Sequence, residues 1–84
     1  MSIQLGDRVR KAREDYGMSA AELARRAGIT RQQVYMIESN RTPDPGVLKI
    51  KAIAQTLRVS VDYLLGLKND ARLFEPAAED LALV

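Results

Sequence analysis

The stretch that decides the fold runs Ser19-Ala-Ala-Glu-Leu-Ala-Arg-Arg-Ala-Gly-Ile-Thr-Arg-Gln-Gln-Val-Tyr-Met-Ile-Glu-Ser39. Ser19 and Glu22 have the spacing of a capping box, in which two side chains close the first turn of a helix, and Thr30 and Gln33 repeat that spacing. Gly28 lies between the two segments and can adopt the left-handed backbone that a sharp corner requires. We therefore expect two short helices joined by a tight turn.

The apolar residues of this stretch fit two helices that cross at a wide angle. Ala24 is small enough for the helices to approach closely, and Ile29, Val34 and Ile37 can fill the wedge between them. Either alanine or glycine alone would indicate little, but the combined spacing is typical of a helix-turn-helix motif. That spacing involves Leu23, Ala24, Gly28, Ile29, Val34 and Ile37.

Helical spacing of apolar residues continues toward the N-terminus, and no segment alternates with a period of two. It predicts a first helix over about residues 3–15, ended by Gly17. The apolar stripe of this helix comprises Leu5, Val9, Ala12 and Tyr16.

Two more helices are expected after the motif. Asp44 is a good N-cap residue for a fourth helix, with Pro45 at its first position, and Ser60 can cap a short fifth helix ended by Gly66. The inward-facing residues of these helices are predicted to be Val47, Ile50, Ile53, Ala54, Leu57, Val61, Leu64 and Leu65. We expect an all-α fold, with one domain over residues 1–66 and a tail over 67–84 in which residues 76–84 form at most a turn or two of helix.

The composition narrows the class of function. The chain has 84 residues, is 46% hydrophobic and contains neither cysteine nor histidine, so we expect no thiolate or imidazole metal site, no cofactor and no enzyme activity. No apolar run is long enough to cross a membrane, and Asp7 and Arg8 interrupt any signal-peptide core, which favours a cytoplasmic protein. Residues 69–84 carry a net charge of −3, which leaves +5 on residues 1–68 of a chain whose net charge is +2. A basic body suits a polyanion-binding domain, although lysines and arginines that merely aid solubility would give the same charge.

From Leu5 to Leu65 the chain resembles the Cro and lambda-type repressor family, also called the XRE family. The matching segments are Leu5-Gly-Asp-Arg-Val-Arg10, Met18-Ser-Ala-Ala-Glu-Leu-Ala24, Gly28-Ile-Thr-Arg-Gln-Gln-Val34, Ile37-Glu-Ser-Asn-Arg-Thr-Pro43 and Ile53-Ala-Gln-Thr-Leu-Arg-Val-Ser-Val-Asp-Tyr-Leu-Leu65. The resemblance implies a compact five-helix, lambda-repressor-like domain that binds double-stranded DNA as a homodimer and regulates transcription. The tail lies outside it.

The resemblance also assigns the DNA contacts. It gives base contacts to Arg31, Gln32 and Met36 on the exposed side of the third helix, flanked by Tyr35 and Gln33. Arginine can bind guanine and glutamine can bind adenine, each through two hydrogen bonds, but an ordinary solvated helix face would carry the same residue types. Gln33 is also needed for its capping box.

Phosphate contacts are expected on both sides of this helix. Ser19 and Ala20 would offer backbone N–H groups at the start of the second helix, although many family members carry glutamine where Ala20 stands. The segment after the third helix supplies Ser39, Asn40, Arg41 and Thr42. Further candidate cations, for which solvated surface is the alternative, are Arg8, Arg10, Lys11, Arg25, Arg26, Lys49 and Lys51.

Glu38 lies on the inward side of the third helix, where a carboxylate needs a partner. In the family, residues at the positions of Arg13 and Glu38 join the first and third helices, so the resemblance implies a structural ion pair here.

The leading hypothesis is a sequence-specific DNA-binding regulator, in particular a repressor at an inverted-repeat operator. The alternative is an antitoxin-type interaction module whose acidic and apolar tail binds a partner protein. The apolar residues around the fifth helix and tail suit a dimer surface, but they could equally fold back on their own core. They are Leu65, Leu67, Leu73, Phe74, Leu81, Leu83 and Val84.

Overall fold

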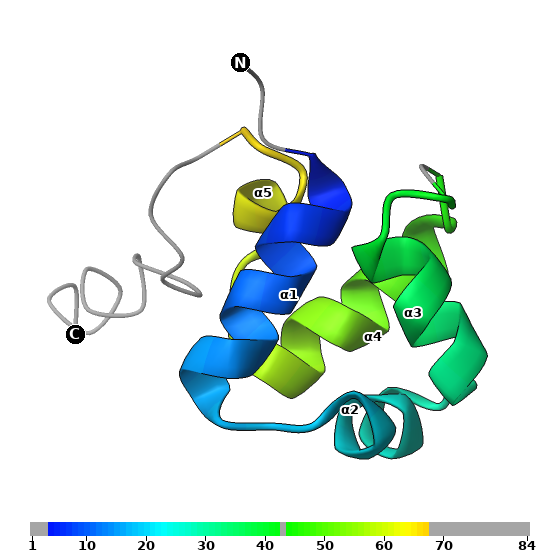
Figure 1. The fold of residues 1–84 in the computed structure, drawn as a ribbon. Helices are drawn as coiled ribbons and strands as arrows, with labels where there is room; N and C mark the ends of the chain where they lie inside the picture. Colours follow the sequence, from blue (N-terminus) through cyan, green and yellow to red (C-terminus); the bar gives the residue numbers. More distant parts are fainter. Residues whose placement is uncertain (1–3, 43, 68–84) are drawn as a thin grey trace, which may run out of the picture.

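The computed structural model describes residues 4–42 and 44–67 of the chain. These residues form five helices and no strand: α1 (Leu5–Tyr16), α2 (Ala20–Ala27), α3 (Arg31–Glu38), α4 (Val47–Leu57) and α5 (Val61–Leu64) (Figure 1). The all-α, five-helix prediction is therefore confirmed. Among the described helices, none has the length and apolar character needed to cross a bilayer.

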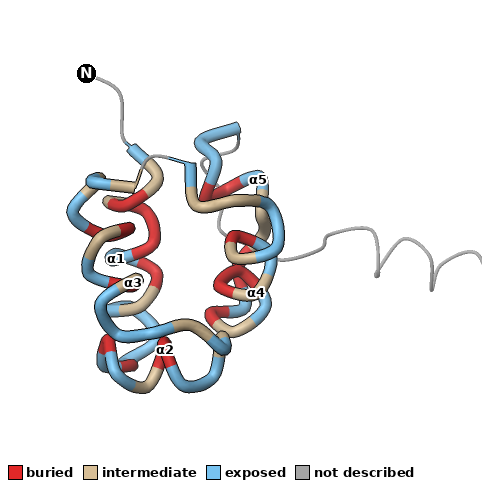
Figure 2. The backbone as a smooth tube through the Cα atoms, turned by 90° about the vertical axis from the view of Figure 1, so that its right-hand side faces the viewer, coloured by how far each residue is buried: buried red, intermediate tan, exposed pale blue. Residues whose placement is uncertain are grey.

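The core lies where the inner faces of the five helices meet, and the buried stretches of the chain turn toward one another (Figure 2). Every helix contributes at least one apolar side chain to it. The largest side chains with almost no exposed surface are Leu23, Ile37, Ile53, Leu64, Val9 and Val34. All six are residues that the apolar spacing predicts to face inward, so the pattern of apolar residues identifies the centre of the core.

The turn between α2 and α3 forms as the sequence predicts. Gly28 ends α2 with a φ of 74°, in the left-handed region. Thr30 Oγ1 accepts a hydrogen bond from the N–H of Gln33 at 3.0 Å, and Gln33 Oε1 accepts one from the N–H of Thr30 at 2.9 Å. This complete capping box fixes the start of α3.

The capping box predicted for α2 is only half formed. Ser19 Oγ accepts a hydrogen bond from the N–H of Glu22 at 3.0 Å. The carboxylate of Glu22 does not return to Ser19 but accepts hydrogen bonds from Arg25 at 2.8 Å and Arg26 at 2.7 Å. Two cations one turn away attract a carboxylate more strongly than a neutral N–H does, which explains the difference.

The predicted start of α4 is wrong. Asp44 and Pro45 precede the helix, and its N-cap residue is Gly46, with a φ of 98° and no side-chain cap. Such a φ is strained for any residue with a Cβ, so the chain changes direction at the glycine and the helix begins after it. Val47, predicted to face inward, is consequently 78% exposed at the first position of the helix.

Three further side chains differ from the prediction. Tyr16, at the last position of α1, is 43% exposed, and Leu65 is 47% exposed because α5 ends at Leu64 and leaves Leu65 beyond the helix. Tyr63, which the apolar pattern did not include, is 7% exposed.

The first helix begins at Leu5 rather than near residue 3. The expected linker and tail turn lie outside the described residues except for Leu67, which is exposed.

The N-terminus of α1 is held against the end of α3 by a contact that we did not expect. The N–H of Gly6 donates a hydrogen bond to Asn40 Oδ1 at 2.9 Å, and Asn40 Nδ2 donates one to Asp7 Oδ1 at 3.4 Å. Asn40 has a left-handed backbone, with a φ of 62°. A Cβ atom at Gly6 would collide with the carbonyl oxygen of Ile37, so α1 approaches α3 more closely than any other residue type at position 6 would allow.

Candidate nucleic-acid interface

The outward face of α3 carries large side chains that the core does not use. Val34 and Ile37 are 1% and 2% exposed on its inner side. Arg31, Gln32 and Tyr35 are exposed on the other side of the helix. The structure therefore separates α3 into a packing face and a solvent face, as the helical wheel predicts.

Most of the predicted base-contacting residues gather around one shallow surface concavity of about 550 Å³. Its lining is Arg31, Gln32, Tyr35, Met36, Ser39 and Arg41. Two guanidinium groups, an amide, a phenol ring and a thioether thus lie within one patch, and these are groups that can contact base edges in a major groove. We call these six residues the reading patch.

Gln33, the fifth predicted base-contacting residue, lies apart from the reading patch. Its side-chain oxygen is held by the N–H of Thr30, and the residue is half-buried. Of the two roles that the sequence predicts for Gln33, helix capping and DNA contact, the structure shows the capping role.

Backbone N–H groups are available at the start of α2 but not after α3. The N–H groups of Ala20 and Ala21 belong to the first helical turn, where no intrahelical acceptor exists, while the side chain of Ala20 is buried. After α3, the N–H groups of Arg41 and Thr42 both donate to the carbonyl oxygen of Met36, at 2.9 and 3.2 Å. A phosphate beside this segment would therefore be met by side chains and not by the backbone of these two residues.

The segment after α3 divides into structural and exposed residues. Asn40 is engaged with Gly6 and Asp7, and Ser39 Oγ donates a hydrogen bond to the carbonyl oxygen of Met36 at 3.2 Å. Arg41 is exposed and Thr42 is half-buried. Of the four predicted phosphate-contacting residues in this segment, Arg41 is the one that presents a cation to solvent.

The other candidate cations differ in how free they are to meet DNA. Arg25 and Arg26 both bind Glu22, and these hydrogen bonds lower the pKa of the Glu22 carboxyl. Arg8 is only 8% exposed, and its guanidinium lies over the ring of Tyr63, 4.7 Å from the centroid. Arg8 therefore does not belong to the exposed basic surface where the sequence analysis placed it.

Arg13 and Glu38 form a two-pronged ion pair between α1 and α3. Arg13 Nε lies 2.7 Å from Glu38 Oε2, and a second hydrogen bond joins the guanidinium to Oε1 at 3.1 Å. The remaining guanidinium nitrogen donates to the carbonyl oxygen of Met18 at 2.9 Å. The side chains are 16% and 7% exposed, and the hydrogen bond to Glu38 is the main cause that raises the pKa of Arg13. The pair links α1 to α3, the helix that carries most of the reading patch.

A family model described as helix-turn-helix matches residues 9–64 of the chain. The HTH-type transcriptional regulators SinR of Bacillus licheniformis and of Bacillus subtilis (strain 168) are each 32% identical to it over 66 residues, or 79% of this chain and 60% of the relative. The chain thus spans about 60% of the length of these curated relatives.

Solved structures give the same result. The crystal structure of SinR, the master regulator for biofilm formation, in complex with DNA has a TM-score of 0.70 and 31% identity, covering 73% of this chain and 97% of that chain. The P22 c2 repressor in complex with a synthetic operator has a TM-score of 0.73 and 28% identity, covering 82% and 100%. Both of these neighbours were solved bound to DNA.

Proposed function

This chain belongs to the helix-turn-helix family of Cro and lambda-type repressors, and on that premise we propose that it is a sequence-specific DNA-binding transcriptional regulator. The family comprises DNA-binding regulators and is not an enzyme family. We further propose that the protein acts as a repressor at an inverted-repeat operator, and in the cytoplasm, because double-stranded DNA is its ligand.

The reading patch is the observation that carries this proposal. Arg31 can bind the O6 and N7 atoms of guanine, and Gln32 can bind the N6 and N7 atoms of adenine, each contact discriminating by roughly 1–3 kcal/mol. Met36 and Tyr35 offer apolar surface to a thymine methyl group. The first turn of α2, and Arg41 within the reading patch, would contact phosphates, which fix position without reading sequence.

The function requires a second copy of the chain. One α3 helix reads only half of an operator, and twofold pairing would place two reading patches about 34 Å apart on one face of DNA. Leu65 and Leu67 are 47% and 72% exposed at the end of α5, and such apolar side chains suit a surface shared between two copies.

Selection of bound duplexes from random DNA, repeated at two salt concentrations, tests the proposed function. We expect a palindromic site and an affinity that falls steeply as salt rises, since phosphate contacts release counterions. Recovery of no common sequence would contradict sequence-specific binding.

Changes at Gln32 and Arg41 should have different signatures. Gln32→Ala is expected to relax preference at one or two base pairs, whereas Arg41→Ala should weaken binding to all sequences and lower the slope of log affinity against log salt by about 1. Titration of each variant against the operator and its single-base variants measures both effects. An equal loss on every sequence for Gln32→Ala would show that this residue does not read bases.

Leu67→Glu should separate two copies of the chain. A buried carboxylate between apolar surfaces is costly, so we expect the dimer dissociation constant to rise about tenfold or more, as measured by sedimentation equilibrium. Val47→Glu is the matched control, because Val47 is 78% exposed at the opposite end of α4 from α5. If Val47→Glu dissociated the dimer and Leu67→Glu did not, the interface would lie at the start of α4.

A further inference from the structure

The first turn of α2 holds a carboxylate that binds two arginines at once. Glu22 Oε2 accepts a hydrogen bond from Arg25 Nη2 at 2.8 Å and another from Arg26 Nε at 2.7 Å. Helical side chains point back toward the N-terminus of their helix, which brings Arg25 and Arg26 onto the turn that contains Glu22. We call these three residues the α2 triad.

The carboxylate of the α2 triad is held at the start of the helix. Ser19 Oγ accepts a hydrogen bond from the backbone N–H of Glu22 at 3.0 Å, which anchors the residue there. The side chain of Glu22 is 31% exposed, compared with 70% for Arg25 and 48% for Arg26. The lowered pKa of the Glu22 carboxyl, caused mainly by the hydrogen bonds from Arg25 and Arg26, keeps it ionised at neutral pH. The two cations therefore have a charged partner on their own helix.

The α2 triad lies beside the proposed phosphate contact. A concavity of about 350 Å³ at the start of α2 includes Ser19, Glu22 and Arg26 in its lining. Helix α2 packs against α3, which carries most of the reading patch (Figure 1). A duplex bound at the start of α2 would therefore approach Arg26 while its guanidinium is engaged by Glu22.

An internal partner reduces what a cation contributes to DNA affinity. An arginine that contacts a phosphate strengthens binding by releasing counterions from the DNA, and this contribution does not depend on base sequence. An arginine already bound by a carboxylate must exchange that partner for the phosphate, so it gains less. With two guanidinium groups against one carboxylate, the α2 triad has a net charge of +1.

We propose that Glu22 is a specificity-determining residue, which holds Arg25 and Arg26 away from DNA phosphates and so limits sequence-independent binding. The inference rests on the proposed function, in which the first turn of α2 contacts a phosphate. Sequence-independent binding depends almost entirely on cations, whereas base contacts fix the position of the protein at an operator. Release of the two arginines therefore strengthens binding to unrelated DNA more than binding to the operator.

Glu22→Gln in the full chain, titrated against a duplex of unrelated sequence at several salt concentrations, tests this role. Glutamine keeps the shape of the side chain and is as suitable as glutamate at this position of a helix. We expect an affinity about 3- to 10-fold higher at about 0.1 M salt, and a slope of log affinity against log salt that is steeper by about 1–2. An unchanged slope would overturn the proposal.

The same variant titrated against the operator measures specificity. The gain in affinity should be smaller there, so that the ratio of operator affinity to unrelated-duplex affinity falls. An unchanged ratio would show that Glu22 sets affinity alone, and its proposed role in specificity would be wrong.

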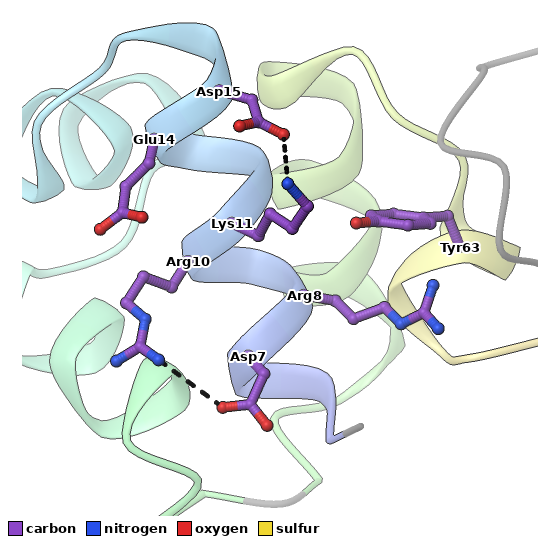
Figure 3. A pocket seen from close by; sticks show the side chains of 7 residues that line it. All are labelled: Asp7, Arg8, Arg10, Lys11, Glu14, Asp15 and Tyr63. Atoms are coloured by element: carbon purple, nitrogen blue, oxygen red, sulfur yellow. Dashed lines mark hydrogen bonds and ion pairs between the residues drawn. The ribbon is translucent and has the colours of Figure 1, made fainter. Parts of the chain in front are cut away.

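Asp15→Asn is the matched control for net charge. Asp15 forms an exposed ion pair with Lys11 on α1, at 3.2 Å (Figure 3), so this change also removes one carboxylate from a pair between residues four positions apart. The concavities that Asp15 lines include Tyr63 of α5 and lie on α1 rather than on α2. We expect the salt slope to stay unchanged. Equal effects of Asp15→Asn and Glu22→Gln would show that net charge is the cause, and the proposal would fail.

A double-mutant cycle tests whether the arginines act through Glu22. Arg25→Gln together with Arg26→Gln should reduce affinity and salt slope more in the Glu22→Gln background than in the unchanged chain, because the arginines reach phosphates only once they are released. Such non-additivity is expected of groups that interact directly. Thermal melting checks that every variant is folded at the temperature of the titration. An equal loss in the two backgrounds would mean that Arg25 and Arg26 act independently of Glu22, contrary to the proposal.

Failure of this inference and failure of the proposed function give different results. The salt slopes are measured on an unrelated duplex and need no operator. If selection from random DNA recovers no common site, the proposed function is wrong. If Glu22→Gln and the unchanged chain have equal slopes while a common site is recovered, only the role of Glu22 is refuted.

Discussion

Gly6→Ala is expected to lower the free energy of unfolding by about 3 kcal/mol, the upper part of the range for overpacking a core. The added methyl group would meet the carbonyl oxygens of Ile37 and Glu38, and these are backbone atoms at the end of a helix that cannot swing aside. Relief would require α1 to move away from α3 and to give up the hydrogen bond from Gly6 to Asn40. A domain of this size has about 4–12 kcal/mol of stability, so the loss is a large part of the total.

Denaturant unfolding followed by circular dichroism measures this effect. Gly17→Ala is the matched control, because Gly17 has a φ of 82° but nothing within 4 Å of an added Cβ. It should cost only the backbone strain of a left-handed residue, about 1–2 kcal/mol. If the two variants lost the same stability, close approach of the helices would not be the reason for glycine at position 6.

Removal of Arg13 is expected to have a comparable or larger effect. Arg13→Met leaves the Glu38 carboxylate 7% exposed and without its cation, and breaking a buried ion pair in this way typically costs about 3–5 kcal/mol. The hydrogen bond to the carbonyl oxygen of Met18 is lost as well. The double variant Arg13→Met with Glu38→Leu removes both charges and should recover most of the stability.

The same ion pair predicts how Glu38→Ala affects DNA binding. We expect binding to fall because the variant is less stable, so that binding per folded molecule stays close to that of the unchanged protein. Thermal melting and DNA titration at a temperature where both proteins are folded make the comparison. A variant that melts normally and yet fails to bind would show that Glu38 acts on DNA and is not a structural residue.

The features that could be predicted from the sequence depend on interactions between residues that are close together in the chain. The caps at Ser19 and Thr30 and the left-handed turn at Gly28 depend on residues close in sequence, and all three form in the structure. The predicted start of α4 is wrong because Asp44 and Pro45 are both favoured at the beginning of a helix, whereas the structure uses Gly46, two positions after Asp44, as the N-cap residue. More than one residue in this segment can precede a helix, and which of them becomes the N-cap residue depends on how the chain approaches the core.

The contacts that hold the site together were harder to predict because they join distant residues. Gly6 and Asn40 are separated by 34 positions, and nothing near either of them specifies the partner. The available signal was a glycine inside a predicted helix, where glycine is unfavourable unless close packing requires it. The position of Asn40 after the third helix predicts a phosphate contact, whereas its hydrogen bonds to Gly6 and Asp7 appear only once α1 and α3 are placed together.

The carbonyl oxygen of Met36 accepts hydrogen bonds from the N–H groups of Arg41 and Thr42 and from the hydroxyl of Ser39. The loop that carries Arg41 is therefore fastened to the last turn of α3 before any duplex arrives. On the proposed binding mode, little conformational entropy would remain to be lost there on association, because the loop and the last turn of α3 are already joined. Such pre-organisation would favour the affinity of the proposed contact, since binding requires no refolding of the loop.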